Sequence, residues 1–297
     1  MENAFSFSGV TKLYPNFKLG PLDLDLEPGT VMGYIGPNGA GKSTTMHCLM
    51  GLVRTNSGTI NVFGKKNDLF KPDWKQDIGY VGDEHVFYEK LTCAKNLKYI
   101  SGYYDNWSFS KMEELIERFE IQLDKKAKDL STGNRVKLAL TAALSHNPKL
   151  ILLDEPTAGL DPLIRAELLD ILQEIMESED HSVFYSTHNL SDISRIADNL
   201  VFLHEGELIL QSDKDSLLDS WRRITCRIEV DSQREFTSVA AVKNMNSDYE
   251  LISKDAPSTI EQLGEIGAEE VIETRMTIEE IAVEILREKK NVARNNL

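Results

Sequence analysis

The fold is decided by Gly36-Pro37-Asn38-Gly39-Ala40-Gly41-Lys42-Ser43-Thr44, which fits the pattern G-x-x-x-x-G-K-[ST]. Glycines let such a loop curl into a nest of backbone N–H groups, and a following helix adds its own unpaired donors. The apolar segment 31–35 predicts a buried strand before the loop, and a helix should begin at Lys42. In this context Lys42 would reach the β- and γ-phosphates, and Ser43 would hold Mg²⁺. A glycine turn without a ligand is the alternative, but the lysine, the hydroxyl and the flanks favour a nucleoside triphosphate.

The composition is that of an ordinary globular protein, with 41% hydrophobic and 27% charged residues. Its 297 residues allow one large domain and a small one. The longest apolar runs are of strand length, so no transmembrane helix is expected, and Met1-Glu2-Asn3 without a basic region leads us to expect no secretory signal. The net charge of −15 opposes binding to nucleic acid or anionic lipid. Three well-separated cysteines predict reduced thiols: Cys48, Cys93 and Cys226.

Alternating and apolar segments punctuated by glycine and proline predict the α/β class. Segments 5–7 and 22–26 alternate as half-buried strands do, whereas 150–153 is a continuous apolar run, typical of a central parallel strand. Residues 1–222 therefore form the predicted main domain.

Helices should dominate residues from about 85 to 147. There, apolar side chains line one face of a predicted helix after Ser110, its expected N-cap: Met112, Leu115, Ile116 and Phe119.

A small α/β domain is predicted for residues 223–297. It should contain a strand over 224–230 and two helices that start at capping boxes, Ser258–Glu261 and Thr277–Glu280. Whether this domain serves dimerisation, regulation or packing stays open.

Polar residues that end predicted parallel strands point to phosphate chemistry. Asp154 is placed to hold Mg²⁺, and Glu155 to polarise the attacking water. His188 ends a neighbouring strand and could contact the γ-phosphate, or it could be structural. Tyr14, on a loop between two strands, could stack on adenine or merely cover apolar surface.

Three further motifs make the chain resemble the ATP-binding subunit of an ABC transporter over about residues 5–221. Leu130-Ser131-Thr132-Gly133-Asn134 is close to the signature Leu-Ser-Gly-Gly-Gln, Ala158-Gly159-Leu160-Asp161 resembles the D-loop, and Ser186-Thr187-His188 resembles the H-loop. The resemblance implies a P-loop NTPase core of ABC ATPase type, with an antiparallel β part, a helical subdomain and the C-terminal appendage.

The resemblance also assigns residues to nucleotide and metal. Tyr14 matches the adenine-stacking aromatic, while Ser131, Thr132, Gly133 and Asp161 would meet ATP across a dimer. Two departures stand out. Thr132 and Asn134 replace glycine and glutamine, as in exporter-type members, and Asp83 stands where the Q-loop glutamine is expected. Asp83 could bind Mg²⁺ directly or through water.

The family implies ATP hydrolysis in a homodimer or heterodimer that drives a separate membrane permease from the inner face of the cell membrane. An aromatic-rich stretch after the Q-loop, between Phe87 and Trp107, could dock that permease. The alternatives are a soluble ABC-type ATPase acting on ribosomes or DNA and a small-molecule kinase. The acidic charge opposes the first, and the kinase leaves the signature, the D-loop and the H-loop unexplained.

Overall fold

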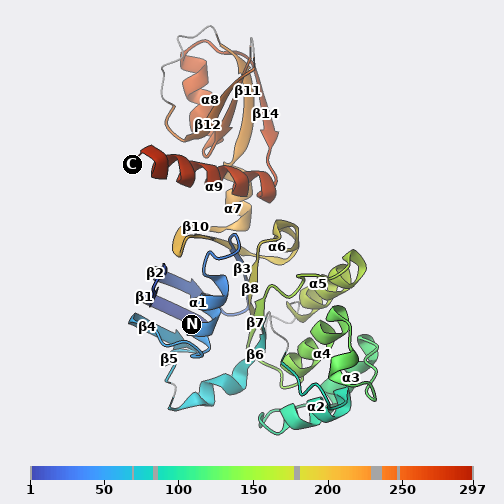
Figure 1. The fold of residues 1–297 in the computed structure, drawn as a ribbon. Helices are drawn as coiled ribbons and strands as arrows, with labels where there is room; N and C mark the ends of the chain where they lie inside the picture. The colour runs from blue at the N-terminus through green and yellow to red at the C-terminus, as the bar shows by residue number, and fades with distance from the viewer. Residues whose placement is uncertain are drawn as a thin grey trace. The chain divides into compact units, whose positions relative to one another are not determined.

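The computed structural model of the chain describes residues 2–68, 70–82, 86–176, 181–228, 236–245 and 248–295 (Figure 1). The chain divides into two compact units, Met1–Leu208 and Ile209–Leu297. The division falls within strand β10 (Glu207–Asp213), earlier in the chain than the limit expected at residue 222. Among the described residues, no helix is both long and apolar enough to cross a membrane.

A six-stranded sheet in the order β10-β9-β3-β8-β7-β6 is the centre of the first unit. Its strands β3, β6, β7, β8 and β9 are parallel where they pair. Every residue of β3, β7 and β8 is buried, as expected for strands covered on both faces. The bounds of these five strands are Val31–Ile35, Ile78–Val81, Leu150–Asp154, Ser182–Thr187 and Asn199–His204.

A four-stranded antiparallel sheet, ordered β2-β1-β4-β5, makes up the predicted antiparallel part. Its strands are β1 (Phe5–Tyr14), β2 (Phe17–Leu26), β4 (Ser57–Val62) and β5 (Lys65–Lys66). Helix α1 (Lys42–Leu49) packs on β7 and β8, and a shared core joins it to both sheets. The phosphate loop is therefore held between the last residue of β3 and the first of α1.

Helices α2 (Cys93–Ser101), α3 (Phe109–Arg118) and α4 (Thr132–Leu144) form the helical part, grouped together in Figure 1. They share a small core built around Leu97 and Leu138, and α4 packs on β6. Short 3₁₀ helices span Pro72–Asp77 and Ala127–Asp129. The expected cap Ser110 is wrong: the hydroxyl of Ser108 accepts the N–H of Lys111 at 3.1 Å, so the N-cap of α3 lies two residues earlier than expected. Two further helices follow β7 and β8: α5 (Pro162–Met176) and α6 (Leu190–Ile196).

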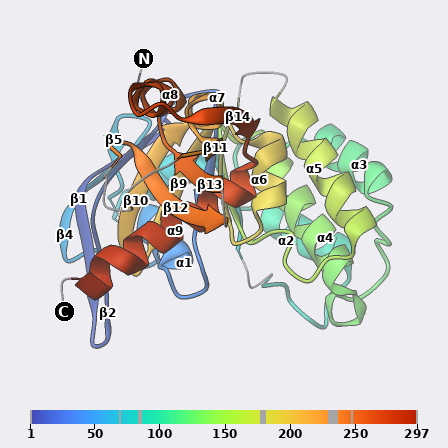
Figure 2. The same cartoon turned by 90° about the horizontal axis from the view of Figure 1, so that it is seen from above.

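The second unit contains an antiparallel sheet in the order β12-β13-β11-β14. Ile224 of β11 belongs to the core beneath α8, whereas its neighbour Arg223 pairs with Glu280 of α9. Because successive strand residues point to opposite faces, α8 and α9 cover opposite faces of this sheet (Figure 2). The elements of this unit are α7 (Lys214–Ser220), β11 (Arg222–Arg227), β12 (Val239–Met245), β13 (Asp248–Ser253), α8 (Ala256–Glu265), β14 (Glu269–Arg275) and α9 (Ile278–Asn295).

Candidate nucleotide-binding site

The phosphate loop takes backbone conformations that only glycine adopts without strain. Gly39 has φ of 80°, and Gly41, the N-cap of α1, has φ of 112°. A Cβ on Gly41 would lie 2.8 Å from Leu19 Cδ1 and 2.9 Å from Phe17 Cζ. A Cβ on Gly36 would lie 2.5 Å from the carbonyl oxygen of Leu203. The loop is thus closely packed at both ends, and at Gly39 a Cβ would meet nothing within 4 Å.

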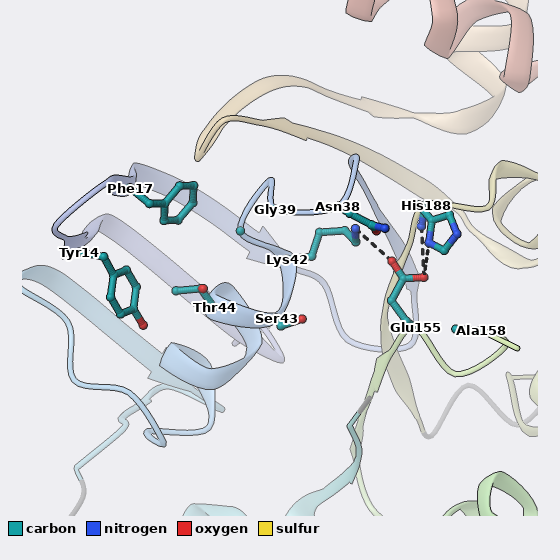
Figure 3. Close-up of a pocket in the computed structure, with 11 residues that line it drawn as sticks. Tyr14, Phe17, Asn38, Gly39, Lys42, Ser43, Thr44, Glu155, Ala158 and His188 are labelled. Carbon is teal, nitrogen blue, oxygen red and sulfur yellow. Dashed lines mark hydrogen bonds and ion pairs between the residues drawn. The ribbon is translucent and has the colours of Figure 1, made fainter. Parts of the chain in front are cut away.

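A cavity of about 530 Å³ opens over this loop (Figure 3). Its size falls within the range of small-molecule sites. The antiparallel sheet, the phosphate loop, the end of β7 and the end of β8 all contribute to its walls. The lining residues are Tyr14, Phe17, Asn38, Gly39, Gly41, Lys42, Ser43, Thr44, Glu155, Ala158 and His188.

The carboxylate of Glu155 lies between Lys42 and His188 (Figure 3). Glu155 Oε1 is 3.0 Å from Lys42 Nζ, and Oε2 accepts hydrogen bonds from His188 Nδ1 at 2.8 Å and from the His188 backbone N–H at 3.3 Å. Lys42 Nζ also donates to the Gly36 carbonyl at 2.7 Å. Only 6% of the Lys42 side chain and 13% of the Glu155 side chain are exposed, so water screens this pair weakly.

Asp154 is buried directly behind the cavity wall, with 1% of its surface exposed. Ser186 Oγ donates to its Oδ1, whereas its Oδ2 has no hydrogen-bond partner among the described residues. An unsatisfied buried oxygen is costly, and Mg²⁺ prefers oxygen ligands such as carboxylates. Asp154 Oδ2, with the Ser43 hydroxyl at the cavity wall, therefore fits a magnesium ion chemically.

The comparisons with known proteins agree with this geometry. Residues 19–158 match the family model described as "ABC transporter". The lantibiotic transport ATP-binding protein SrtF of Streptococcus pyogenes is 36% identical over 202 residues, which cover 66% of this chain and 85% of SrtF. The chain belongs to the family of ABC transporter ATP-binding proteins.

Two further comparisons define the extent of this likeness. YdbJ of Bacillus subtilis (strain 168), an uncharacterised ABC transporter ATP-binding protein, is 31% identical over 192 residues, which span 64% of this chain and 62% of YdbJ. A solved structure of the ATP-binding subunit of an ABC transporter aligns with a TM-score of 0.65 and 27% identity. That alignment covers 73% of this chain and 92% of the solved one. The P-loop NTPase fold of ABC ATPases is thus confirmed, and the chain binds ATP as a member of this family.

Phe17 is a site residue of this ABC ATPase that sequence reasoning missed. Its ring lies beside that of Tyr14, with centroids 6.5 Å apart and planes at 34°. Tyr14 is 42% exposed, and Lys12 Nζ lies 5.1 Å from the centroid of its ring. Tyr14 is the last residue of β1 rather than part of the loop expected from the sequence, and Phe17 opens β2 after a two-residue turn. A second aromatic three residues further along was therefore the available signal.

Ala158 of the D-loop lines the cavity, whereas Asp161 and the signature residues Ser131, Thr132 and Gly133 are not among the lining residues of their own chain. Ser131 and Thr132 are exposed at the start of α4, where Ser131 Oγ accepts the N–H of Asn134 at 3.3 Å. Gly133 is buried, and a Cβ there would lie 2.8 Å from Ile164 Cδ1. Asp161 caps α5 by accepting the N–H groups of residues 163 and 164, each at 3.1 Å. Asp83 lies outside the described residues.

Proposed function

We propose that this ABC ATPase hydrolyses ATP at the cavity above its phosphate loop and so drives export through a separately encoded membrane permease. The observation that carries the proposal is the carboxylate of Glu155, which is flanked by Lys42 and His188 at the mouth of the phosphate nest. This is the arrangement expected of a group that orients water against a bound γ-phosphate.

Each residue would have a distinct part in the reaction. The phosphate loop and Lys42 would bind the β- and γ-phosphates, and Tyr14 with Phe17 would stack on the adenine. Mg²⁺, held by Ser43 and Asp154, would supply charge neutralisation. Glu155 would orient the attacking water and take up its proton. Because Nδ1 of His188 contacts Glu155, the opposite ring nitrogen, Nε2, would remain for the γ-phosphate.

The working form we propose is a dimer, with the signature of one subunit facing the phosphate loop of the other. The exposure of Ser131 and Thr132 away from their own cavity supports this, because a lone chain then has an incomplete site. Homodimer and heterodimer both satisfy this geometry. Export is supported by Thr132 and Asn134 in the signature and by similarity to SrtF, whose name assigns it to lantibiotic transport.

A cluster of three exposed tyrosines on and near α2 fits the docking of the permease at the inner face of the membrane. The rings of Tyr88 and Tyr99 lie 4.8 Å apart, and those of Tyr99 and Tyr103 lie 5.3 Å apart. Between 45% and 61% of each residue is exposed. Amphipathic aromatic side chains of this kind are enriched at protein interfaces. No nucleic-acid partner is proposed, because the net charge is −15.

The test is Glu155→Gln in the full chain. Hydrolysis should fall by at least about 100-fold, since the carboxylate that takes up the proton is lost. Binding of Mg-ATP should persist, and the molar mass in solution should rise from monomer to dimer when Mg-ATP is added. Glu114→Gln, an exposed glutamate of α3, serves as the matched control. Hydrolysis near the wild-type rate would refute the role given to Glu155.

A further inference from the structure

Asp192 is a fully buried carboxylate that joins four elements of the first unit. It belongs to α6, and its Oδ2 accepts hydrogen bonds from Thr157 Oγ1 at 2.6 Å and from Tyr185 OH at 3.0 Å. Its Oδ1 accepts from Nε of Arg165, which lies in the first turn of α5. Arg165 also donates to the hydroxyl of Ser191. The turn after β7, strand β8 and helices α5 and α6 therefore meet at one side chain.

The environment of Asp192 compensates the cost of its burial. A buried carboxylate without partners is strongly unfavourable, whereas here three donors, one of them a guanidinium, satisfy both oxygens. Burial and the charge of Asp192 raise the pKa of Tyr185 well above its ordinary value of 10.0, which keeps the phenol protonated as a donor. Removing one partner from such a network leaves the others unsatisfied, so the arrangement is rigid.

The backbone at Glu155 needs such an anchor. Its φ is 50°, in the left-handed region that is unfavourable for a residue with a Cβ. A tight turn follows, in which the N–H of Ala158 donates to the carbonyl of Glu155 at 3.0 Å and that of Leu160 donates to the carbonyl of Thr157 at 3.2 Å. Strained conformations persist only where surrounding contacts fix them. The Thr157 hydroxyl is the point at which this turn is bound to Asp192.

The same carboxylate also lies on the helix that follows His188. Asn189 caps α6, so His188 directly precedes the helix that carries Asp192. Thr157 follows Glu155 by two positions, and Asp192 follows His188 by four. The segment after β7 and the segment after β8 therefore contact each other twice: through Glu155 and His188 at the cavity, and through Thr157 and Asp192 in the interior.

We propose that Asp192 is a positioning residue which, through Thr157, fixes the turn that holds the Glu155 carboxylate between Lys42 and His188. This inference rests on the proposed role of Glu155 in ATP hydrolysis. Thr157 is the link, because its hydroxyl donates directly from the Glu155 turn to the α6 carboxylate at 2.6 Å. The Tyr185 hydroxyl supports this link, since it lies 3.4 Å from Thr157 Oγ1 and 3.0 Å from Asp192 Oδ2.

The test is Thr157→Val in the full chain, which keeps the shape of the side chain and removes the donor. We expect kcat for Mg-ATP hydrolysis to fall about 10-fold while KM changes less than about twofold, because small displacements of a reacting group lower the rate without lowering affinity. Thr157→Ser retains the hydroxyl and should restore most of kcat. Thr141→Val is the matched control, since it removes another fully buried threonine hydroxyl, in α4.

A purely structural hydroxyl predicts a different pattern. Thr157→Val and Thr141→Val would then both lower the thermal midpoint and leave kcat unchanged below it, and this outcome would overturn the inference. Glu155→Gln, measured alongside, separates the two proposals. If Glu155→Gln is inactive and Thr157→Val is fully active, only the positioning role fails. If Glu155→Gln hydrolyses ATP normally, the proposed function fails at its source.

Discussion

At Glu155 the side chain and the backbone are held by different parts of the molecule. The carboxylate contacts Lys42 and His188, and the backbone N–H donates to the Ser186 carbonyl at 3.0 Å. A left-handed φ at such a residue costs on the order of 1–3 kcal/mol. That cost is offset by the contacts that fix the turn, including those of the Glu155 carboxylate and backbone. The strained backbone and the carboxylate proposed to act in hydrolysis thus belong to one residue.

His146 should make the stability of the first unit depend on pH. It is 1% exposed, its Nε2 donates to the Ile78 carbonyl at 3.1 Å, and its ring stacks on that of Tyr104 with centroids 3.9 Å apart. Burial lowers the pKa of His146 below its ordinary value of 6.5. At a pH between the two pKa values, His146 is therefore protonated in the unfolded chain and neutral in the folded chain. This residue's contribution to stability is fully present above pH 6.5 and is lost as the pH falls towards its folded pKa.

The measurement is the free energy of unfolding between about pH 7.5 and 5.5, where histidines titrate. His146→Gln should flatten the fall in stability that we expect for the wild type over this window. Tyr104→Phe keeps the stacked ring and removes no histidine, so it should retain the wild-type slope. Equal slopes for the wild type and His146→Gln would mean that other groups cause the dependence.

Among the elements, the start of α4 offers a test that distinguishes two roles of Ser131, capping the helix and contacting a nucleotide. Ser131 caps the helix in its own chain, and we propose that it also faces the γ-phosphate bound by a partner. Ser131→Asp keeps a good N-cap but adds a negative charge. We expect Mg-ATP binding to the monomer to persist, whereas the ATP-dependent dimer of the Glu155→Gln background should be lost, because the new charge repels the phosphate.

The readout is the molar mass of the double variant with and without Mg-ATP. Ser108→Asp, which replaces the N-cap of α3 in the same way, is the matched control and should leave the dimer intact. A Ser131→Asp dimer as stable as the control would show that the signature does not contact the nucleotide.

Helix starts show how far the sequence determined these elements. The box at Thr277 forms as predicted: the N–H of Thr277 donates to Glu280 Oε2 at 2.9 Å, and the N–H of Glu280 donates to Thr277 Oγ1 at 3.3 Å. The box predicted at Ser258 is wrong, because Asp255 caps α8 and precedes a proline suited to the first turn. Candidate caps compete within a few residues, and the local pattern does not rank them.

The candidate site was predictable most directly where one segment carries the chemistry. The phosphate loop and Asp154-Glu155 are contiguous motifs, so spacing alone identified them. Phe17 lies close to Tyr14 in the chain, so only its aromatic character three residues further along could have indicated it. Asp192 contacts Thr157 across 35 positions of sequence, and no local pattern indicates that contact. Strands β12 and β13 were not foreseen for a related reason, since neither alternates between buried and exposed residues: β12 is half-exposed and then exposed, and β13 is half-exposed and then buried.

At the scale of the whole molecule, the two units have separate cores. Residues such as Phe184 and Leu152 belong to the first core, and Ile224, Leu251 and Leu263 to the second. A unit with its own core is able to unfold as a unit. We therefore expect two thermal transitions, of which only the one belonging to residues 1–208 responds to nucleotide.

Mg-ATP at about 100 times its dissociation constant should stabilise the first unit by about 2.7 kcal/mol and so raise its transition. The second transition should depend on the hydrogen bonds of Arg222. This residue is 8% exposed and donates to the Trp221 carbonyl at 2.8 Å and to Glu273 Oε1 at 2.7 Å. Arg222→Met keeps the apolar stem of the side chain. It should lower the free energy of unfolding of the second unit by about 2 kcal/mol, because the charged hydrogen bonds are lost.

Scanning calorimetry of the full chain with and without Mg-ATP measures both effects in one experiment. Lys42→Ala should abolish the nucleotide-dependent shift and leave the second transition in place, because its side chain belongs to the phosphate loop. Arg222→Met should lower one transition while the other still rises with Mg-ATP. If Arg222→Met also removed the response to Mg-ATP, or if a single transition moved as a whole, the second unit would be energetically coupled to the nucleotide site, and a regulatory role for it would follow.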